Sequence, residues 1–401
     1  MFIYNIGILF YRLGICIVSC FRPEVKKMRN GEKEAVSKVR ETRKDGQKWV
    51  WVHAASLGEF EQGRPLIERI KAKEPETKVL LSFFSPSGYE VRKNYNLADL
   101  VVYLPLDTPQ NARKFIDALK PEKVYIVKYE FWLNYLNNLR KRNIETYIVS
   151  AIFREGQVFF KWYGGIFREG LKAFRTLFVQ NEESKELLAG IGFDNVVVAG
   201  DTRFDRVSDI AKAAKQLPIV NAFAIKEKTL VVGSSWAPDE ELLCRWMNKH
   251  KEYKMIIAPH HVEEGRIKEI ESRLTRKSVR YTECKNVEDV AGADVLIINT
   301  IGLLSSIYQY GAVAYIGGGF GVGIHNTLEA AVWGMSVVFG PNYHKFKEAK
   351  ELIDCNGGFS IKNYDEMENA MQKAFSEPQY GKNAAVYVQS RIGAADLIID
   401  N

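Results

Sequence analysis

The chain has 401 residues, of which 46% are hydrophobic and 26% charged, enough apolar material for two ordinary domains. It has no low-complexity tract, which excludes a disordered or fibrous protein. The formal net charge of +7 favours anionic partners such as a membrane surface, a phosphorylated lipid or a nucleotide. Basic residues form no stripe interleaved with aromatics, so we expect no nucleic-acid partner.

The first 21 residues are the unusual part of the composition. Phe2 to Phe21 is about as long as a bilayer span and mostly apolar, interrupted chiefly by Asn5 and Arg12. Residues 22–48 then carry ten Lys or Arg against five Asp or Glu. An apolar helix before a basic segment predicts contact with a membrane whose cytoplasmic side holds the following domain. Three placements stay open: a helix that spans the bilayer, one that lies in the interface, or one docked on protein.

Strands and helices alternate along most of the chain. Apolar runs predict strands at 49–53, 78–84, 100–104, 123–127, 146–151, 176–180 and 196–199, and later at 229–233, 254–258, 278–282, 295–299, 312–316 and 336–339. Such alternation predicts parallel sheets covered by helices on both faces. Residues 201–228 break the rhythm, so we predict a domain at 22–200, a linker at 201–228 and a second domain at 229–382. Two such Rossmann-like domains leave a cleft for a ligand.

One strand-to-helix turn stands out in the first domain. The strand at 49–53 runs into Ala54, Ala55 and Ser56, and a helix opens near Glu59. Small residues between a strand and a helix start are typical of ligand sites in α/β proteins. Glu59 is the acid at that turn and is a candidate general base. The alternative is a capping box, since Ser56-x-x-Glu59 matches that pattern.

Two further charged segments lie at predicted element ends of the first domain. Lys128 and Glu130 follow the strand at 123–127 and form either a surface ion pair or a charged lip for an anionic substrate. Arg203, in the predicted linker, is a candidate for binding a leaving phosphate, or a solvated hinge charge. No nucleophile paired with a histidine is visible, which argues against hydrolase chemistry.

In the second domain, the stretch 317–323 reads G-G-G-F-G-V-G after a predicted strand, and a helix is predicted over 326–333. Glycines let a backbone approach phosphate closely, and a helix start offers free amides, so a ligand loop is favoured over tight packing alone. Glu329 could accept hydrogen bonds from a ribose.

The chain shows no pattern for a resident metal. His260 and His261 are adjacent and make a poor metal pair, because neighbouring residues in an extended turn point apart. No Asp-x-Asp motif is present, and the five cysteines are scattered without a C-x-x-C pair. We therefore expect metal-independent chemistry and reduced thiols.

The chain contains several motifs that, by their sequence and their order, resemble those of the 3-deoxy-D-manno-octulosonic acid (Kdo) transferases of lipopolysaccharide synthesis. They are H-A-A-S-L-G-E at 53–59, Y-E-F-W-L-N at 129–134, Q-N-E-E at 180–183, G-D-T-R-F-D at 200–205, P-H-H at 259–261, G-I-H-N-T-L-E-A-A at 323–331 and V-V-F-G-P-N at 337–342. The resemblance implies the glycosyltransferase B (GT-B) fold, with an acceptor-binding first domain and a CMP-Kdo-binding second domain. It also implies a last helix, for which 383–401 is the candidate, that returns to the first domain.

The resemblance implies an inverting transfer of Kdo from CMP-Kdo to a lipid A precursor such as lipid IVA, on the cytoplasmic side of the inner membrane. Glu59 would be the proton acceptor, and the other candidate catalytic residues are Lys128, Glu130 and Arg203. The candidate donor-binding residues are Pro259, His260, His261, Ile301, Gly302, Leu303, Asn326, Thr327, Leu328 and Glu329.

Some positions depart from the family pattern. Lys128 stands where the family often has an acid, so a catalytic role at that position is doubtful, and Glu130 matches only the second acid of the motif. His260, Leu303 and Thr327 replace the usual arginine, acid and proline. Two alternatives stay open: another GT-B enzyme that uses a UDP-sugar, either a glycosyltransferase or an epimerase, or a non-catalytic protein that binds a membrane surface. Neither the oligomeric state nor the number of Kdo units transferred follows from these residues.

Overall fold

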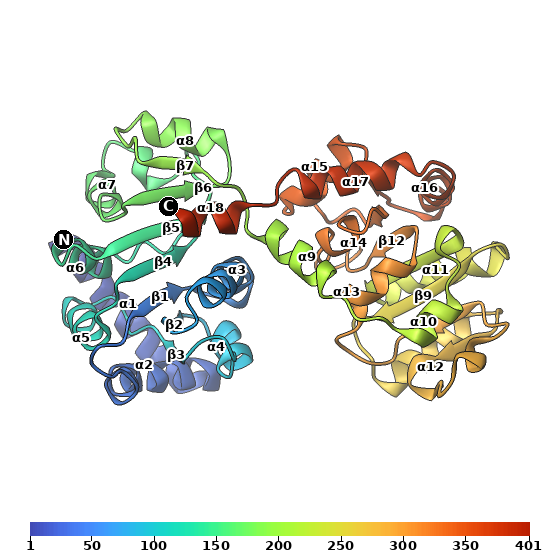
Figure 1. The fold of residues 1–401 in the computed structure, drawn as a ribbon, viewed down its shortest axis with the longest axis horizontal. Coiled ribbons are helices and arrows are strands. Elements are labelled where there is room, and N and C mark those ends of the chain that lie inside the picture. Colours follow the sequence, from blue (N-terminus) through green and yellow to red (C-terminus); the bar gives the residue numbers. More distant parts are fainter. The chain divides into compact units, whose positions relative to one another are not determined.

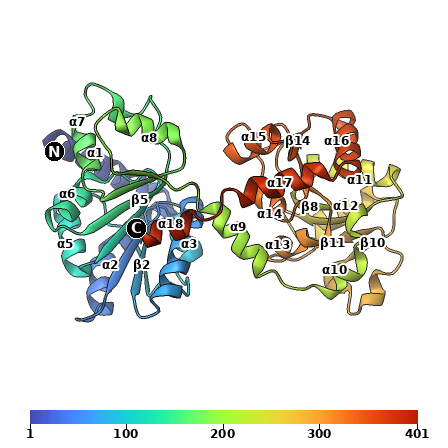
Figure 2. The same cartoon turned by 45° about the horizontal axis from the view of Figure 1, so that its top comes forward.

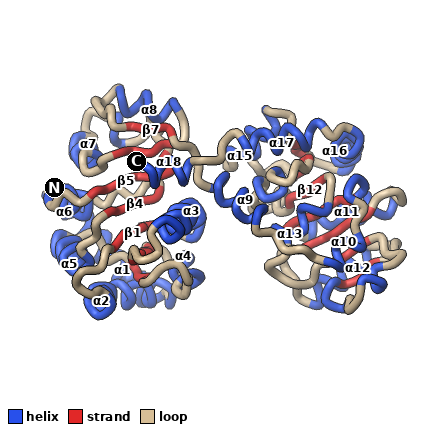
Figure 3. Tube along the Cα trace, viewed as in Figure 1, coloured by secondary structure: helices blue, strands red, loops and turns tan.

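The computed structural model describes all 401 residues, which form two compact units (Figure 1). Unit 1 comprises Met1–Arg206 and Gly393–Asn401, and unit 2 comprises Val207–Ile392. Each unit is built on a seven-stranded sheet in which every strand pair is parallel. Helices surround both sheets (Figure 3), which is how parallel sheets are covered. The predicted α/β class with two Rossmann-like domains is confirmed.

Unit 1 holds the strands in the order β3-β2-β1-β4-β5-β6-β7. The strands are β1 Trp49–His53, β2 Lys78–Phe83, β3 Leu100–Tyr103, β4 Lys123–Val127, β5 Glu145–Ala151, β6 Thr176–Val179 and β7 Val196–Val198. The helices are α1 Phe2–Phe21, α2 Pro23–Thr42, α3 Leu57–Lys73, α4 Pro86–Arg92, α5 Pro109–Leu119, α6 Leu133–Lys141, α7 Gly165–Leu171, α8 Glu182–Ala189, α9 Arg203–Lys212 (which continues into unit 2) and α18 Ala394–Asp400.

The two faces of the unit 1 sheet are filled by alternate residues of the same strands. Trp49 and Trp51 of β1 pack toward α2, α5 and α6, whereas Val50 and Val52 pack toward α3 and α18. This alternation follows from the two-residue period of a strand. Because both faces are apolar, β1 is buried along its whole length, and the side chains that remain for chemistry lie beyond its ends.

Unit 2 holds the strands in the order β10-β11-β9-β8-β12-β13-β14. The strands are β8 Thr229–Ser235, β9 Lys254–Pro259, β10 Ser278–Arg280, β11 Val295–Ile297, β12 Val313–Ile316, β13 Ser336–Phe339 and β14 Gly358–Ser360. The helices are α10 Pro218–Phe223, α11 Ala237–Lys249, α12 Glu264–Arg273, α13 Leu304–Ile307, α14 Leu328–Ala331, α15 Lys347–Asp354, α16 Tyr364–Ser376 and α17 Gln379–Gln389. One face of this sheet is filled by α11, α12 and α16.

Two predicted helices are shorter than expected. The helix predicted over 326–333 is reduced to the single turn Leu328–Ala331, because the preceding residues form an irregular loop. The aromatic segment 159–174, for which the sequence also predicts a helix, consists of a 3-10 turn at Val158–Phe160 and then α7. The short α14 therefore supplies much less of a helix dipole than the sequence predicts.

Residues 383–401, predicted as one helix, belong to two. The end of α17 lies in unit 2, whereas α18 packs against α3 in unit 1 (Figure 2). Asp205 joins the start of α18 to α9: its Oδ1 accepts from the Gly393 amide at 2.7 Å and its Oδ2 from the Ala395 amide at 3.1 Å. The chain therefore returns to unit 1 through Gly393, which has a φ of 114°.

Helix α1 exposes most of its apolar side chains. Phe2, Ile3 and Phe21 are each about four-fifths exposed, and the helix is long and apolar enough to cross a membrane. Its inner side is nevertheless fastened to unit 1. The Tyr4 hydroxyl donates to Asp107 Oδ2 at 2.7 Å, and Asn134 Nδ2 donates to Asn5 Oδ1 at 2.8 Å.

Candidate functional site

In unit 1 the candidate residues follow the carboxyl ends of two neighbouring strands. In the sheet, β1 lies between β2 and β4. The chain runs from β1 to β2 and β3 on one side, and then crosses back to β4 on the other side of β1. In parallel α/β sheets this reversal is the usual place for a ligand. Glu59 follows β1, and Lys128 and Glu130 follow β4.

Glu59 lies in the first turn of α3. Ser56 is the N-cap residue, and its Oγ accepts from the Glu59 amide at 3.4 Å. The Glu59 carboxylate accepts a much shorter hydrogen bond, 2.6 Å, from the Ala55 amide. Burial, and then the negative charge of Glu130, raise the pKa of Glu59 above its usual value. The side chain therefore has a capping contact and also the increased basicity that a general base needs.

Glu130 accepts a hydrogen bond from one ring and lies beside a second. Trp132 Nε1 donates to Glu130 Oε2 at 2.6 Å, and His53 Nε2 lies 3.6 Å from the same oxygen. His53 Nδ1 is 2.8 Å from Ser82 Oγ, which accepts from Trp51 Nε1 at 2.7 Å. Nδ1 also lies 3.2 Å from the Ser82 carbonyl oxygen, so Ser82 orients the His53 ring from the neighbouring strand.

Lys128 has a φ of 60°, a left-handed conformation that residues with a side chain adopt rarely. Its amide donates to the Val149 carbonyl at 2.9 Å, which fixes the backbone at the end of β4. Its positive charge acts on Glu59 in the opposite direction to Glu130, lowering the pKa of that carboxyl, but with a smaller effect. Strained backbone of this kind tends to occur at functional sites.

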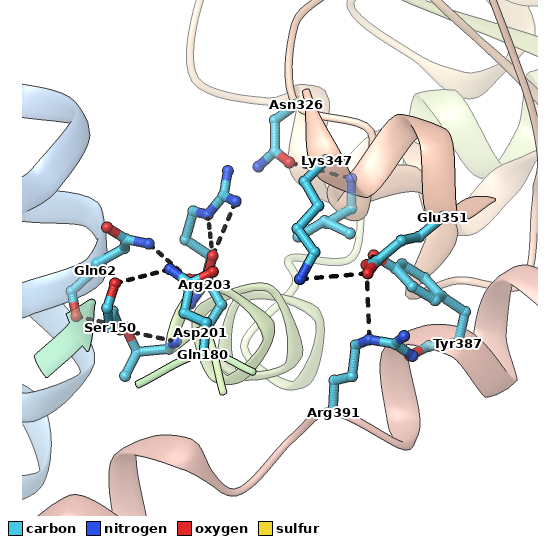
Figure 4. A network of polar contacts seen from close by, with 12 residues as sticks. Gln62, Ser150, Gln180, Asp201, Arg203, Asn326, Lys347, Glu351, Tyr387 and Arg391 are labelled. Carbon is cyan, nitrogen blue, oxygen red and sulfur yellow. Dashed lines mark hydrogen bonds and ion pairs between the residues drawn. The ribbon is translucent and has the colours of Figure 1, made fainter. Parts of the chain in front are cut away.

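Arg203 is oriented by Asp201 (Figure 4). Arg203 Nε and Nη2 both lie 2.9 Å from Asp201 Oδ2, and Gln62 Nε2 donates to the other carboxylate oxygen at 2.9 Å. Burial opposes the charge of Asp201, but Arg203 and the hydrogen bonds outweigh it and hold the pKa of Asp201 below its usual value. A third of the Arg203 side chain stays exposed. The guanidinium is thus a fixed cation on the surface of unit 1.

In unit 2 the candidate residues follow β9, β11 and β12. Of these strands, β9 and β12 flank β8, and β11 lies on the other side of β9. His260 stacks on Trp236 with ring centres 4.6 Å apart and on His325 at 4.8 Å, and Trp236 Nε1 donates to His325 Nε2 at 3.3 Å. His261 meets the Trp236 ring edge-on. Burial, and then a neighbouring imidazole, lower the pKa of both His260 and His325. The stack is therefore neutral at physiological pH and offers flat rings instead of charge.

The glycine-rich loop serves packing at several of its positions. A Cβ on Gly317 would lie 2.3 Å from the Ser234 carbonyl oxygen, and one on Gly319 would lie 2.6 Å from the Gly340 backbone. The Gly318 amide already donates to Asp239 Oδ2 at 2.9 Å. At Gly321 a Cβ would meet only one atom, at 3.8 Å, and the Gly321 amide donates to the Gly318 carbonyl at 3.0 Å.

The other donor-site candidates differ in accessibility. Ile301 is 81% exposed and Gly302 has a φ of 86°, so this turn presents backbone to solvent before α13. Asn326 Nδ2 donates to Glu329 Oε1 at 3.0 Å, and Asn326 Oδ1 accepts from the Leu328 amide. Three more candidates complete the group: Pro259 ends β9, Leu303 is half-buried, and Thr327 is buried.

Sequence reasoning missed several residues that shape these sites. Trp236 and His325 complete the ring stack, and Asp239 holds the glycine loop through Gly318. Ser82 orients His53 from the neighbouring strand. A usable signal was Trp236 before Ala-Pro, a helix start directly after a strand.

Comparison with known proteins agrees with the resemblance seen in the sequence motifs. Residues 28–206 match the family model for 3-deoxy-D-manno-octulosonic-acid transferase (Kdo transferase). The chain is 28% identical to the 3-deoxy-D-manno-octulosonic acid transferase of Aquifex aeolicus over 334 residues, which cover 82% of this chain and 86% of that protein. It is 24% identical over 400 residues to a bifunctional glycosyltransferase/methyltransferase of Fusobacterium nucleatum, covering 95% of this chain and 61% of that protein.

Solved structures show the same fold at low identity. A UDP-N-acetylglucosamine 2-epimerase from Listeria monocytogenes has a TM-score of 0.58 at 13% identity, covering 88% of this chain and 95% of that one. MurG of Acinetobacter baumannii has a TM-score of 0.54 at 13% identity, covering 88% of this chain and 98% of that one. These likenesses confirm the predicted GT-B fold class.

Proposed function

Because the chain belongs to the Kdo transferases, a family of glycosyltransferases, we propose that it transfers Kdo from CMP-Kdo to a lipid A precursor such as lipid IVA. The observation that carries this proposal is the environment of Glu59. A half-buried carboxylate whose pKa is raised lies at the reversal point of the unit 1 sheet, where α/β proteins bind ligands.

Glu59 is the general base of the proposed reaction. It takes the proton from a sugar hydroxyl of the acceptor, and the hydroxyl oxygen forms a bond to the anomeric carbon of Kdo. The bond from that carbon to the phosphate oxygen of CMP breaks, and CMP leaves with the electron pair. Attack from the face opposite the leaving group inverts the configuration. General-base assistance of this kind contributes about 10²–10⁴-fold to the rate.

Charge around Glu59 supports that role. Burial and then the Glu130 charge raise the pKa of Glu59, whereas the Ala55 amide, His53 and Lys128 lower it. The balance leaves the pKa above its ordinary value, so the carboxylate is a stronger base than an exposed glutamate. A hydrogen bond from Trp132 holds Glu130 in place. We assign Glu130 to tuning and positioning of the base, and Lys128 to the local charge balance.

Unit 2 is the proposed donor-binding unit. The neutral rings of Trp236, His260 and His325 suit a nucleobase, and the exposed Ile301–Gly302 backbone suits its polar edge. His261, Pro259, Leu303 and the segment from Asn326 to Glu329 complete the proposed donor site. Arg203 supplies the positive charge that a leaving phosphate requires. The sequence has no Asp-x-Asp motif, and we infer a reaction that needs no metal.

The acceptor is a lipid, and α1 supports a membrane location. Its exposed apolar side chains and the basic α2 that follows suit the cytoplasmic face of the inner membrane. Arg12 lies in the middle of α1 and favours a helix that lies in the interface over one that spans the bilayer.

The test is incubation of the full chain with lipid IVA and CMP-Kdo, followed by mass analysis of the lipid. We expect addition of Kdo by the wild type, and loss of that addition by at least about 10²-fold in Glu59→Gln. Glu76→Gln, which changes an exposed glutamate beyond α3, is the matched control and should keep full activity. Absence of a Kdo adduct with the wild type would sink the proposal. Thermal stabilisation by UDP but not by CMP would favour an enzyme that uses a UDP-sugar.

A further inference from the structure

A hollow of about 660 Å³ lies in unit 1 among α1, α2 and the segment that leads from β3 into α5. It does not include Glu59 or any other residue of the candidate catalytic turn. Basic side chains dominate its lining. They are Arg12 from α1, Arg29, Lys33 and Arg40 from α2, and Lys114 from α5.

None of these five cations forms an ion pair. Arg29 donates a hydrogen bond to Ser19 Oγ at 3.2 Å, but no carboxylate lies within 4.0 Å of any of the five. Elsewhere on α2, by contrast, Lys38 pairs with Glu34 at 3.0 Å. Basic groups gathered without acidic partners repel one another, and an anion relieves that repulsion.

Two acids also belong to the lining. Glu41 is exposed at the end of α2, and Glu32 is half-buried with Oε1 lacking a hydrogen-bond partner. Burial raises the pKa of Glu32 to about 7, so much of its negative charge is absent at neutral pH. Five cations against two acids leave the hollow positive.

The rest of the lining is partly apolar and partly hydrogen-bonding, and this combination favours one class of anion over others. Ile15, Val36 and Leu106 contribute apolar surface, whereas Thr108, Gln110 and Asn111 contribute hydrogen-bonding groups from the start of α5. The adjacent helix α1 exposes apolar side chains, such as Leu13 and Ile17. A small soluble anion needs no apolar wall. A lipid needs both, because its phosphate is polar and its acyl chains are not.

We propose that this hollow binds the phosphate of a lipid headgroup whose acyl chains lie beside α1. The proposal rests on the membrane location of α1 given above. Lys33 of α2 and Lys114 of α5 contact the phosphate, and Arg12, Arg29 and Arg40 complete the cationic lining.

A chain of aromatic contacts links α1, which forms one wall of the hollow, to the candidate catalytic residues. Tyr11 of α1 stacks on Phe84 with ring centres 6.3 Å apart, and Phe84 packs on Trp132 at 5.1 Å. Trp132 in turn donates to Glu130. A lipid phosphate held beside α1 is therefore held on the same sheet edge as Glu59. The lipid can be the acceptor itself or a neighbouring phospholipid, since both present the same chemistry.

The first experiment measures binding to vesicles. Full-length protein is floated with phosphatidylcholine vesicles, with and without phosphatidic acid. We expect Lys33→Gln/Lys114→Gln to lose roughly tenfold or more of the affinity gained from phosphatidic acid, since each basic residue near an anionic surface contributes substantially. Neither side chain has a structural partner in the fold, so the variant should remain folded.

The matched control is Lys26→Gln/Arg113→Gln. It removes the same charge from the same two helices, at exposed positions outside the hollow. We expect it to lose less than about threefold. Equal losses in the two variants would overturn the proposal, because general surface charge would then explain the binding. A wild type that binds no vesicle would overturn both the hollow and the membrane location of α1.

A second arm separates the two lipid sources. In detergent without phospholipid, a rise in the KM for lipid IVA with unchanged kcat in Lys33→Gln/Lys114→Gln assigns the hollow to the acceptor. An unchanged KM, together with weaker vesicle binding, assigns it to a neighbouring phospholipid. If the wild type transfers no Kdo at all, the proposed function fails while the vesicle measurement still tests the hollow.

Discussion

His53 Nε2 lies 3.6 Å from Oε2 of Glu130, across the adjoining ends of β1 and β4. Trp132 donates to the same oxygen at 2.6 Å, and this hydrogen bond holds the carboxylate beside His53. Its fixed charge raises the pKa of Glu59, next in effect after burial. The basicity of the proposed catalytic residue therefore depends on a neighbour that is distant in sequence.

Glu130→Gln should move the acidic limb of the pH profile of kcat/KM to lower pH. Removing the Glu130 charge removes one cause of the raised pKa, so Glu59 would ionise at lower pH. The amide keeps an oxygen that can accept from Trp132. The profile is measured from about pH 5 to pH 9 by Kdo transfer to lipid IVA. An unchanged acidic limb would show that Glu130 does not tune Glu59.

Glu59→Gln should stabilise unit 1 at neutral and alkaline pH. The folded-state pKa of Glu59 is raised above its ordinary value, so stability is lost as the pH rises from the ordinary value to the folded-state value, and the full cost remains above it. Below the ordinary value of about 4.3, both states are protonated and this cost is absent. We expect the gain in Tm in thermal unfolding to grow as the pH rises above about 4.3 and to level off above the folded-state pKa of Glu59. A gain independent of pH would contradict this account.

Acid should weaken unit 2 through the ring stack. His325 Nε2 accepts from Trp236 only when it is unprotonated, and the folded-state pKa values of His325 and His260 are lowered. Their contribution to stability is therefore present above the ordinary value of about 6.5 and is lost as the pH falls through the folded-state values. CMP binding by calorimetry should weaken in the same range. His325→Gln should reduce this pH dependence, whereas the exposed control His344→Gln should not.

Gly58→Ala should preserve the fold but impair the reaction. A Cβ at this exposed second position of α3 meets no atom within 4 Å. Replacing a helical glycine with alanine stabilises by about 0.5–1 kcal/mol. If the acceptor sugar approaches the turn beside Glu59, the methyl group obstructs it and the KM for the acceptor rises.

Gly265→Ala is the control for that variant. Gly265 is also the exposed second residue of a helix, α12, with no atom within 4 Å of its Cβ position. It should gain similar stability with unchanged kinetics. Unchanged kinetics in both variants would place the acceptor away from the Gly58 turn.

Asp205→Ala should loosen α18. The buried Asp205 carboxylate accepts from the amides of Gly393 and Ala395, so it caps this helix from a distant part of the chain. Loss of such a cap costs about 0.5–2 kcal/mol. Limited proteolysis should then cut near residue 393, whereas the exposed control Asp194→Ala should leave the cleavage rate unchanged. Equal cleavage rates in all three proteins would contradict the capping role.

Local sequence patterns predicted most of the fold. Apolar runs and turn residues located nearly all strands, because most strands, such as β1 and β4, are buried on both faces. The strand-to-helix turn at Glu59 could also be predicted, because β1, which leads into it, is one of these buried strands. The single-turn α14 was not predicted, since the loop before it is shaped by contacts of Gly319 with Gly340 and of Gly321 with Asn342, which local sequence does not encode.

The arrangement of the candidate site depends on strand order. Sequence places Glu59 and Glu130 71 positions apart, and only the pairing of β1 with β4 brings their turns to one edge. Ser82 reaches His53 only because β2 lies on the other side of β1. Trp236 and His325 likewise meet through the adjacency of β8 and β12. Long-range pairing is the information that a single sequence does not supply directly.

Unit 1 is built from two segments that are far apart in the sequence, and this has a consequence for biosynthesis. Residues 207–392 emerge from the ribosome after most of unit 1 but before Gly393–Asn401, which complete it. Until then Asp205 lacks its two amide donors, and the α3 surface that α18 covers stays open. Domains usually fold in order of synthesis. Here the first unit to begin folding is also the last to finish, so a nascent chain that lacks residues 393–401 carries an incomplete unit 1.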